Sequence, residues 1–133
     1  MGTGDNTEFV ELYNTTTGPV TLTGLAIILV NGSNNTEYLR TALTGVLPAG
    51  GYLVLADNTT VVDPAATVIR FTTATDSIQN GAPDAVILFD TVHHNVLDAL
   101  SYEGSITAAI LTSETATFSA VEGTPLPLSL IHI

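Results

Sequence analysis

The 133-residue chain contains no cysteine, no lysine and no tryptophan. Without cysteine it can form neither a disulfide framework nor a thiolate zinc site, and it has no cysteine nucleophile. No apolar stretch approaches the roughly 20 residues that a membrane-spanning helix needs. Residues 1–6 supply neither the basic nor the apolar segment of a signal peptide, so we expect any export signal to lie upstream.

Positive charge is nearly absent as well. Arg40 and Arg70 stand against thirteen acidic residues, which gives a formal net charge of −11. Affinity for nucleic acids rests on Lys and Arg side chains that displace counterions from phosphates, and anionic membranes attract basic segments for the same reason. We therefore expect no direct nucleic-acid binding and no membrane partner.

The residues that are present favour β-structure. Hydrophobic residues make up 45% of the chain and charged residues 11%, which excludes disorder through low hydrophobicity. The composition leans towards Thr, Val, Leu, Ala and Gly, and β-branched residues with many turn formers are typical of all-β domains. A chain of this length suits one domain.

The first predicted strand, Glu8 to Asn14, alternates: Val10 and Leu12 face one way, and Phe9, Glu11 and Tyr13 the other. The apolar run 25–30 is predicted to be a strand covered on both faces, and the Asn31-Gly32 pair that follows it predicts a tight hairpin turn. Further short strands are predicted at 20–24, 36–43, 52–56, 66–71, 85–89, 96–102, 106–111 and 116–121. Short strands joined by Gly, Asn and Pro turns indicate a β-sandwich.

The last six residues, 128–133, read LSLIHI. This is the peptide obtained by translating the transposase adapter of short-read DNA libraries, and the alternative is an ordinary apolar tail. We expect a single domain over residues 1–127 of a metagenomic gene fragment, with an adapter-derived tail at 128–133 that carries no functional argument, His132 included. The fold is then truncated at one or both termini.

Five ordered motifs carry a family resemblance: EFVELYN (8–14), VTLTGLAI (20–27), LPAGGYLVLA (47–56), SIQNGAPDAVILFD (77–90) and VLDALSYEG (96–104). Together they resemble the lamin tail domain family, and more specifically its branch in exported, multidomain bacterial proteins. The resemblance implies an all-β, immunoglobulin-like β-sandwich. Members of this branch usually have one more strand before the equivalent of Glu8–Asn14 and a closing strand after the Gly104 region.

The resemblance also implies a role. It indicates a non-catalytic binding, attachment or spacer module of a larger exported bacterial protein, located extracellularly or at the cell surface. Its partners would be other domains of the same parent chain, and protein or cell-surface ligands. Two alternatives are an accessory domain of a secreted nuclease or phosphatase, whose parent carries a separate catalytic domain, and a self-assembling cell-surface component.

His93-His94 is the first candidate site. Adjacent histidines suggest a metal or general-base site, but neighbours on an extended chain point to opposite sides, and the spacing matches no zinc motif. We expect a solvent-exposed hairpin tip.

Carboxylates are the second candidate. Asp76, Asp84, Asp90 and Asp98 flank two predicted strands, while Asp57 and Asp63 share a loop. Calcium prefers several oxygen ligands, so a loop calcium site is physically possible, although no EF-hand-like run occurs. We expect solvated acidic loops, with no cofactor.

Glu11 is the third candidate, because Phe9 and Tyr13 flank it on one face. If that face is covered, the carboxylate needs a partner, and we hypothesise a structural pair with Arg40 or Arg70. No serine-hydrolase elbow, P-loop or dinucleotide fingerprint occurs, so we predict no catalytic, cofactor-binding or metal residues. The four Asn-x-Ser/Thr sequons, at 14, 31, 34 and 58, are what chance gives in a Thr-rich chain.

Overall fold

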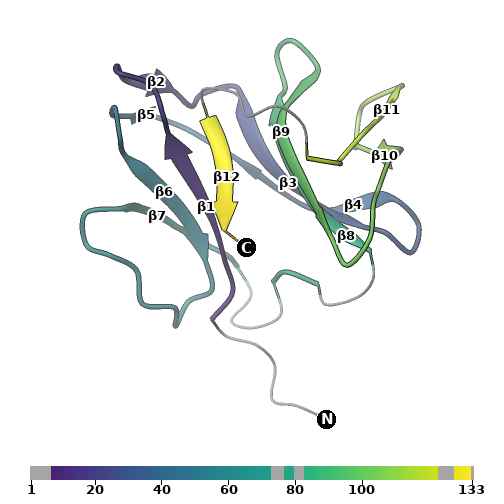
Figure 1. Ribbon diagram of the computed structural model, residues 1–133, viewed down its shortest axis with the longest axis horizontal. Helices are drawn as coiled ribbons and strands as arrows, with labels where there is room; N and C mark the ends of the chain where they lie inside the picture. Colours follow the sequence, from purple (N-terminus) through teal and green to yellow (C-terminus); the bar gives the residue numbers. More distant parts are fainter. Residues whose placement is uncertain (1–6, 73–76, 80–82, 123–127, 133) are drawn as a thin grey trace.

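Two β-sheets face each other in the computed structural model (Figure 1). It describes residues 7–72, 77–79 and 83–122, together with the backbone of 128–132. The strand order of the four-stranded sheet is β12-β1-β6-β7, and that of the six-stranded sheet is β11-β10-β4-β3-β8-β9. The predicted all-β sandwich is confirmed. No helix in the described part of the chain is long and apolar enough to cross a membrane.

The four-stranded sheet consists of β1 (Phe9–Asn14), β6 (Tyr52–Ala56), β7 (Thr67–Arg70) and β12 (Leu128–His132). Strand β1 lies between β6 and β12, antiparallel to both, and β7 runs parallel to β6 at the edge. Alternation in β1 follows the prediction: Val10 and Leu12 are fully buried, while Phe9, Glu11 and Tyr13 are half-buried on the outer face. The segment expected to be an adapter-derived tail thus contributes β12, and the domain boundary at residue 127 stays a prediction.

The six-stranded sheet consists of β3 (Leu25–Asn31), β4 (Thr36–Ala42), β8 (Asp84–Asp90), β9 (Asn95–Tyr102), β10 (Ala109–Ile110) and β11 (Thr117–Phe118). The β3–β4 and β8–β9 pairs are antiparallel hairpins, as predicted. The predicted tight Asn31-Gly32 turn is wrong in its detail: the β3–β4 turn runs from Gly32 to Asn35, and its left-handed residue is Asn35, with a φ of 59°. The pair β2 (Val20–Thr21) and β5 (Val46–Leu47) forms a small separate ribbon. The sequence pattern did not predict β5, and it predicted longer strands at β2, β10 and β11.

Strand β3 separates two hydrophobic clusters. Leu25, Ile27 and Leu29 pack into the cluster between the two sheets, whereas Ala26, Ile28 and Val30 belong to a second cluster on the opposite face. The second cluster is covered by chain segments after β9, through Ile106, Leu111, Phe118 and their neighbours. This explains why β3 is apolar without alternation: both of its faces exclude water.

Gly32, in the β3–β4 turn, shows how tightly this end of the sandwich is packed. A Cβ atom at Gly32 would lie 1.9 Å from the carbonyl oxygen of Pro83, a distance that no side chain tolerates. The Gly32 amide also lies 3.3 Å from Oδ1 of Asp84, to which it donates a hydrogen bond. Glycine is required here by the close approach of two backbones.

Candidate functional site

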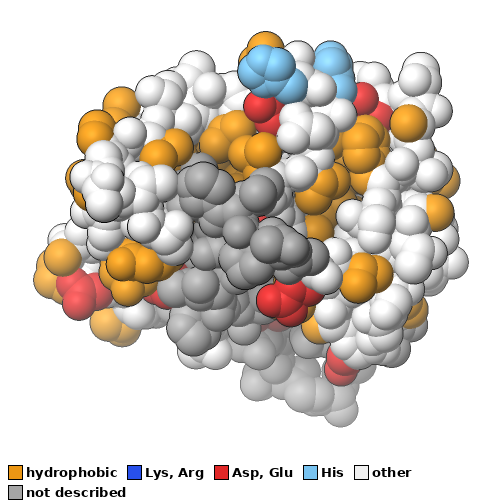
Figure 2. All heavy atoms as spheres, turned by 45° about the horizontal axis from the view of Figure 1, so that its top comes forward, with side chains coloured by type: hydrophobic (Ala, Val, Ile, Leu, Met, Phe, Trp, Pro, Cys, Tyr) orange, Lys and Arg blue, Asp and Glu red, His pale blue; other side chains and the backbone are white. Residues whose placement is uncertain are grey.

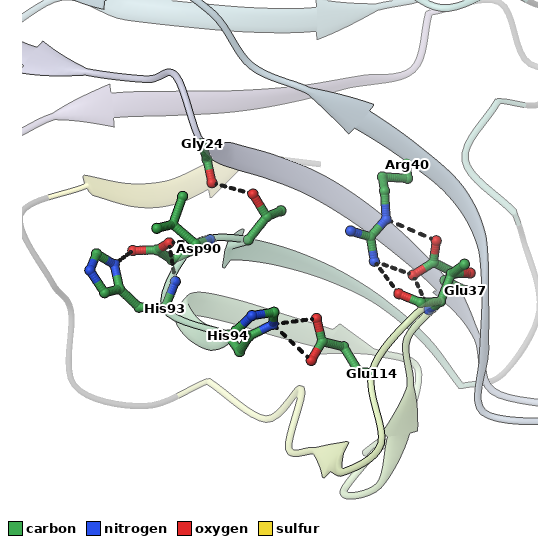
Figure 3. A network of polar contacts seen from close by, with 10 residues as sticks. Gly24, Glu37, Arg40, Asp90, His93, His94 and Glu114 are labelled. Carbon is green, nitrogen blue, oxygen red and sulfur yellow. Dashed lines mark hydrogen bonds and ion pairs between the residues drawn. The ribbon is translucent and has the colours of Figure 1, made fainter.

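The two adjacent histidines lie at the tip of the β8–β9 hairpin and each contacts a different carboxylate (Figure 3). Nδ1 of His93 is 2.8 Å from Oδ2 of Asp90, and Nδ1 of His94 is 3.0 Å from Oε1 of Glu114. Both side chains are largely exposed and protrude from the surface, as Figure 2 shows. The expected exposed tip is confirmed, and the two rings do not converge on one ion.

Asp90 stabilises the turn between β8 and β9. Its Oδ1 accepts hydrogen bonds from the backbone amides of Val92 and His93, both at 2.9 Å. These bonds and the His93 side chain hold the pKa of the Asp90 carboxyl below its usual range, with the His93 backbone amide as the largest cause. This is the conventional role of an Asp at a hairpin turn.

The candidate carboxylates are dispersed over the fold. Asp84 and Asp90 lie at opposite ends of β8, and Asp98 lies on β9, where its Oδ1 accepts from the amide of Ala99. Asp76 lies outside the described residues. Within the described ranges, no group of three or more His, Asp or Glu side chains could hold a metal ion.

The expectation of solvated carboxylates is wrong for Asp57 and Asp84, because the fold buries both side chains. Asp57 accepts a short hydrogen bond from the hydroxyl of Ser77, and Asp84 accepts from Gly32, yet Oδ2 of each is buried without a hydrogen-bond partner. A spare carboxylate oxygen is what a cation would need, but the described side chains bring no set of ligands to either.

Both arginines have partners other than Glu11. Arg40 forms a bidentate ion pair with Glu37, at 2.8 Å from Nη2 to Oε2 and 3.0 Å from Nε to Oε1. Arg70 donates through Nη1 to the backbone carbonyls of Asp57 and Thr60. The hypothesised pair of Glu11 with Arg40 is therefore wrong, because Glu37, three residues away on the same strand, takes that guanidinium. Arg70 instead fixes the loop that follows β6.

Asn14 is a buried polar residue whose role the sequence did not reveal. Its Nδ2 lies 2.9 Å from the carbonyl oxygens of both Gly18 and Leu47, and its Oδ1 accepts from the amide and hydroxyl of Thr16. Asn14 thus joins the turn after β1 to β5. The Asn14 side chain of this sequon is fully buried.

A groove lies on the outer face of the four-stranded sheet and has a volume of about 590 Å³. The register of β1 against β6 places Phe9, Glu11 and Tyr13 opposite Ala56, Val54 and Tyr52 on this face. The loop between β6 and β7, on the left of Figure 1, forms its wall. The lining residues are Phe9, Glu11, Gly50, Gly51, Tyr52, Val54, Thr60–Asp63, Ala65 and Ala66.

The groove is apolar with an acidic component. Val54 is only 4% exposed although it lies on the outer face, and Val61 on the loop is 96% exposed. Tyr13 and Tyr52 stack at one end, with ring centroids 4.6 Å apart. Glu11 and Asp63 are the acidic residues in the lining, and the described lining contains no basic residue.

Sequence reasoning missed this groove. The outer-face set on β1 was visible as an alternation pattern, but the pairing of β1 with β6 and the path of the loop were not. A groove of this size, lined by aromatic and aliphatic side chains with a few polar groups, has the character of a ligand site.

Comparison with protein families matches residues 1–104 to the Lamin Tail Domain family. The chain belongs to the lamin tail domain family. The match covers the strands from β1 to β9 and all the residues that line the groove, whereas β10, β11 and β12 lie beyond it. It confirms the immunoglobulin-like fold that the five motifs implied. The family consists of non-catalytic domains, in agreement with the prediction for this part of the protein. A comparison with curated proteins found no match.

Proposed function

We propose that this lamin tail domain is a binding and attachment module of a larger exported bacterial protein, acting at the cell surface through the groove on its four-stranded sheet. The observation that carries the proposal is the groove itself: a concave surface of about 590 Å³ with aromatic, aliphatic and acidic lining. The candidate catalytic residues support a non-catalytic role, because His93, His94 and their carboxylates form separate surface pairs.

The loop that shapes the groove is organised before any ligand binds. Arg70 holds its first turn through the carbonyls of Asp57 and Thr60, and Asp63 accepts a hydrogen bond from the amide of Ala65 in its second turn. The amide of Ala66 donates to the carbonyl of Asp63 at 3.0 Å. A preorganised wall favours binding, since less conformational entropy is lost on association.

Retention of a reporter on cells tests this proposal. The domain is fused to a fluorescent protein and incubated with intact Gram-positive and Gram-negative cells. We expect the fusion to be retained by at least one cell type, and Ala65→Phe, which fills the groove, to abolish retention. Ser105→Phe adds the same side chain to an exposed position after β9 and serves as the matched control. Equal retention of both variants, or of the reporter alone, would contradict attachment through the groove.

Self-assembly at the surface is a second candidate, favoured by one observation. Strand β7 is the edge of the four-stranded sheet, and Thr67, Val68 and Arg70 on it are exposed. An open edge can pair with a strand of another copy. Light scattering over a concentration series would then show assembly in the parent and loss of assembly in Val68→Lys. A monomer at all concentrations would remove this candidate.

A further inference from the structure

The groove on the four-stranded sheet combines apolar walls with acidic groups, and we propose that it binds an extended peptide segment of another protein through Lys or Arg side chains. This inference rests on the proposed binding function, because it names the ligand class of the same groove.

The shape and lining suit such side chains. Lys and Arg combine a long aliphatic stem with a charged end, so the stem can lie on apolar surface while the charge remains near polar groups. In the groove, Phe9 and Val54 supply the apolar floor, and Val61 on the loop lies at the exposed rim. Carboxylates stand on both sides, with Glu11 on β1 and Asp63 on the loop.

The charge distribution selects a basic ligand. Only acidic side chains provide formal charge within the described lining, and the whole chain carries a net charge of −11. A cationic segment is attracted both by the local carboxylates and by the field of the protein, whereas an anionic ligand is repelled by both.

A second copy of this chain does not fit the description. The chain has no lysine, and both arginines are engaged within the fold: Arg40 with Glu37 and Arg70 with two backbone carbonyls. The basic side chains are therefore assigned to a different protein.

Neutral sugars are less well matched to the groove than a basic peptide. Sugar rings gain most from an open aromatic face, but Tyr13 and Tyr52 stack on each other with an interplanar angle of 26°, so each covers one face of its neighbour. A sugar would also gain nothing from the net charge of the protein. The peptide is the ligand that uses all of the features together.

Fluorescence anisotropy with a short labelled peptide that alternates Lys and Pro tests the proposal. An otherwise identical peptide with Gln in place of Lys is the neutral probe. We expect the Lys peptide to bind the wild-type domain about tenfold more tightly than the Gln peptide, with affinity falling as salt increases.

Two pairs of substitutions, each removing two negative charges, locate the site. The double variant Glu11→Gln, Asp63→Asn should bind the Lys peptide about fivefold more weakly than the wild-type domain, since exposed charge pairs each contribute modestly to affinity. Glu103→Gln with Glu122→Gln, at exposed positions outside the groove, should change affinity less than twofold. Asp63→Asn alone keeps an acceptor for the Ala65 amide and should still weaken binding, so the test survives if the Glu11 variant fails to fold.

Amide chemical-shift mapping completes the test, with shifts expected in residues 50–54 and 60–66. Equal binding of the Lys and Gln peptides, or equal loss in both double variants, would overturn the basic-peptide inference. A neutral oligosaccharide that binds wild type and is lost in Ala65→Phe would also overturn it, while leaving the binding module in place. If the Lys peptide binds as expected but the reporter is not retained on cells, the ligand class stands and the attachment function fails.

Discussion

Asn14 and Leu47 are joined by a hydrogen bond of 2.9 Å from the Asn14 side chain to the Leu47 carbonyl, across 33 residues of sequence. Asn14 is the last residue of β1, is fully buried and contacts the β2–β5 ribbon through this bond. Through its bonds to Thr16, Gly18 and Leu47, the Asn14 side chain links the end of β1, the turn that follows it and the β2–β5 ribbon.

Replacing Asn14 by Ala should lower the free energy of unfolding by about 3 kcal/mol, because buried carbonyls and the Thr16 groups lose their partner together. Urea unfolding measures the change. Asn34→Ala is the control: Asn34 accepts hydrogen bonds from Thr36 in the exposed β3–β4 turn, and its loss should cost about 1 kcal/mol or less. Similar losses in the two variants would show that burial of Asn14 adds nothing.

Gly32→Ala should destabilise the domain by about 2–4 kcal/mol, since the new methyl group would occupy the position of the Pro83 carbonyl and force the backbones apart. Thermal unfolding or urea titration reports the loss. Gly18→Ala is a matched substitution with no heavy atom within 4 Å of the added Cβ, and it should change stability little. Tolerance of Ala at position 32 would contradict the close approach of these two turns.

Glu37 should make the free energy of unfolding depend on pH in the acid range. Burial opposes its ionisation, but hydrogen bonds from Arg40 and Thr112 outweigh burial and hold the pKa of Glu37 below its usual 4.5. A carboxyl whose pKa is lowered by folding stabilises the protein above the unfolded pKa, and this contribution is lost as the pH falls through the lower, folded pKa. Glu37→Gln should therefore cost about 1 kcal/mol at neutral pH and much less in strong acid. Glu122→Gln, at an exposed position, should show no such difference between the two conditions.

Tyr38 and Tyr102 should make the free energy of unfolding depend on pH in the alkaline range. Burial raises the pKa of Tyr38 from 10.0 to about 12 and also raises the pKa of Tyr102. The folded state then holds protons that the unfolded state releases, so stability falls as the pH rises above 10. The chain has no Lys or Cys whose titration would add to this dependence.

The double variant Tyr38→Phe, Tyr102→Phe should lose about 1 kcal/mol per hydrogen bond to Gln79 at neutral pH, yet decline less steeply between pH 10 and 12 than the parent. Urea titrations across this interval measure both effects. Ser101→Ala removes the hydrogen bonds to Ala120 and Ile106 without removing a tyrosine, so its decline should match the parent. A double variant that declines as steeply as the parent would refute the assignment to these tyrosines.

The sequence by itself determined the layers of this protein. Alternation at Val10 and Leu12 was enough to place the buried face of β1, and the unbroken apolar run of β3 was enough to predict burial on both sides, because side-chain direction in a strand follows from local geometry. The turn formers at 31–35 were enough to predict the β3–β4 hairpin, although the left-handed residue of its turn is Asn35 and not Asn31 or Gly32. The five motifs were enough to predict the family.

Tertiary structure alone decided the site. Glu11 and Asp63 line one groove because β1 pairs with β6 in one register and because Arg70 draws the intervening loop across the sheet face. Arg40 pairs with Glu37 on the same strand and not with Glu11, as had been hypothesised. Strand pairing, loop path and ion-pair choice depend on contacts between residues distant in the chain, and periodicity along a single segment carries no information about them.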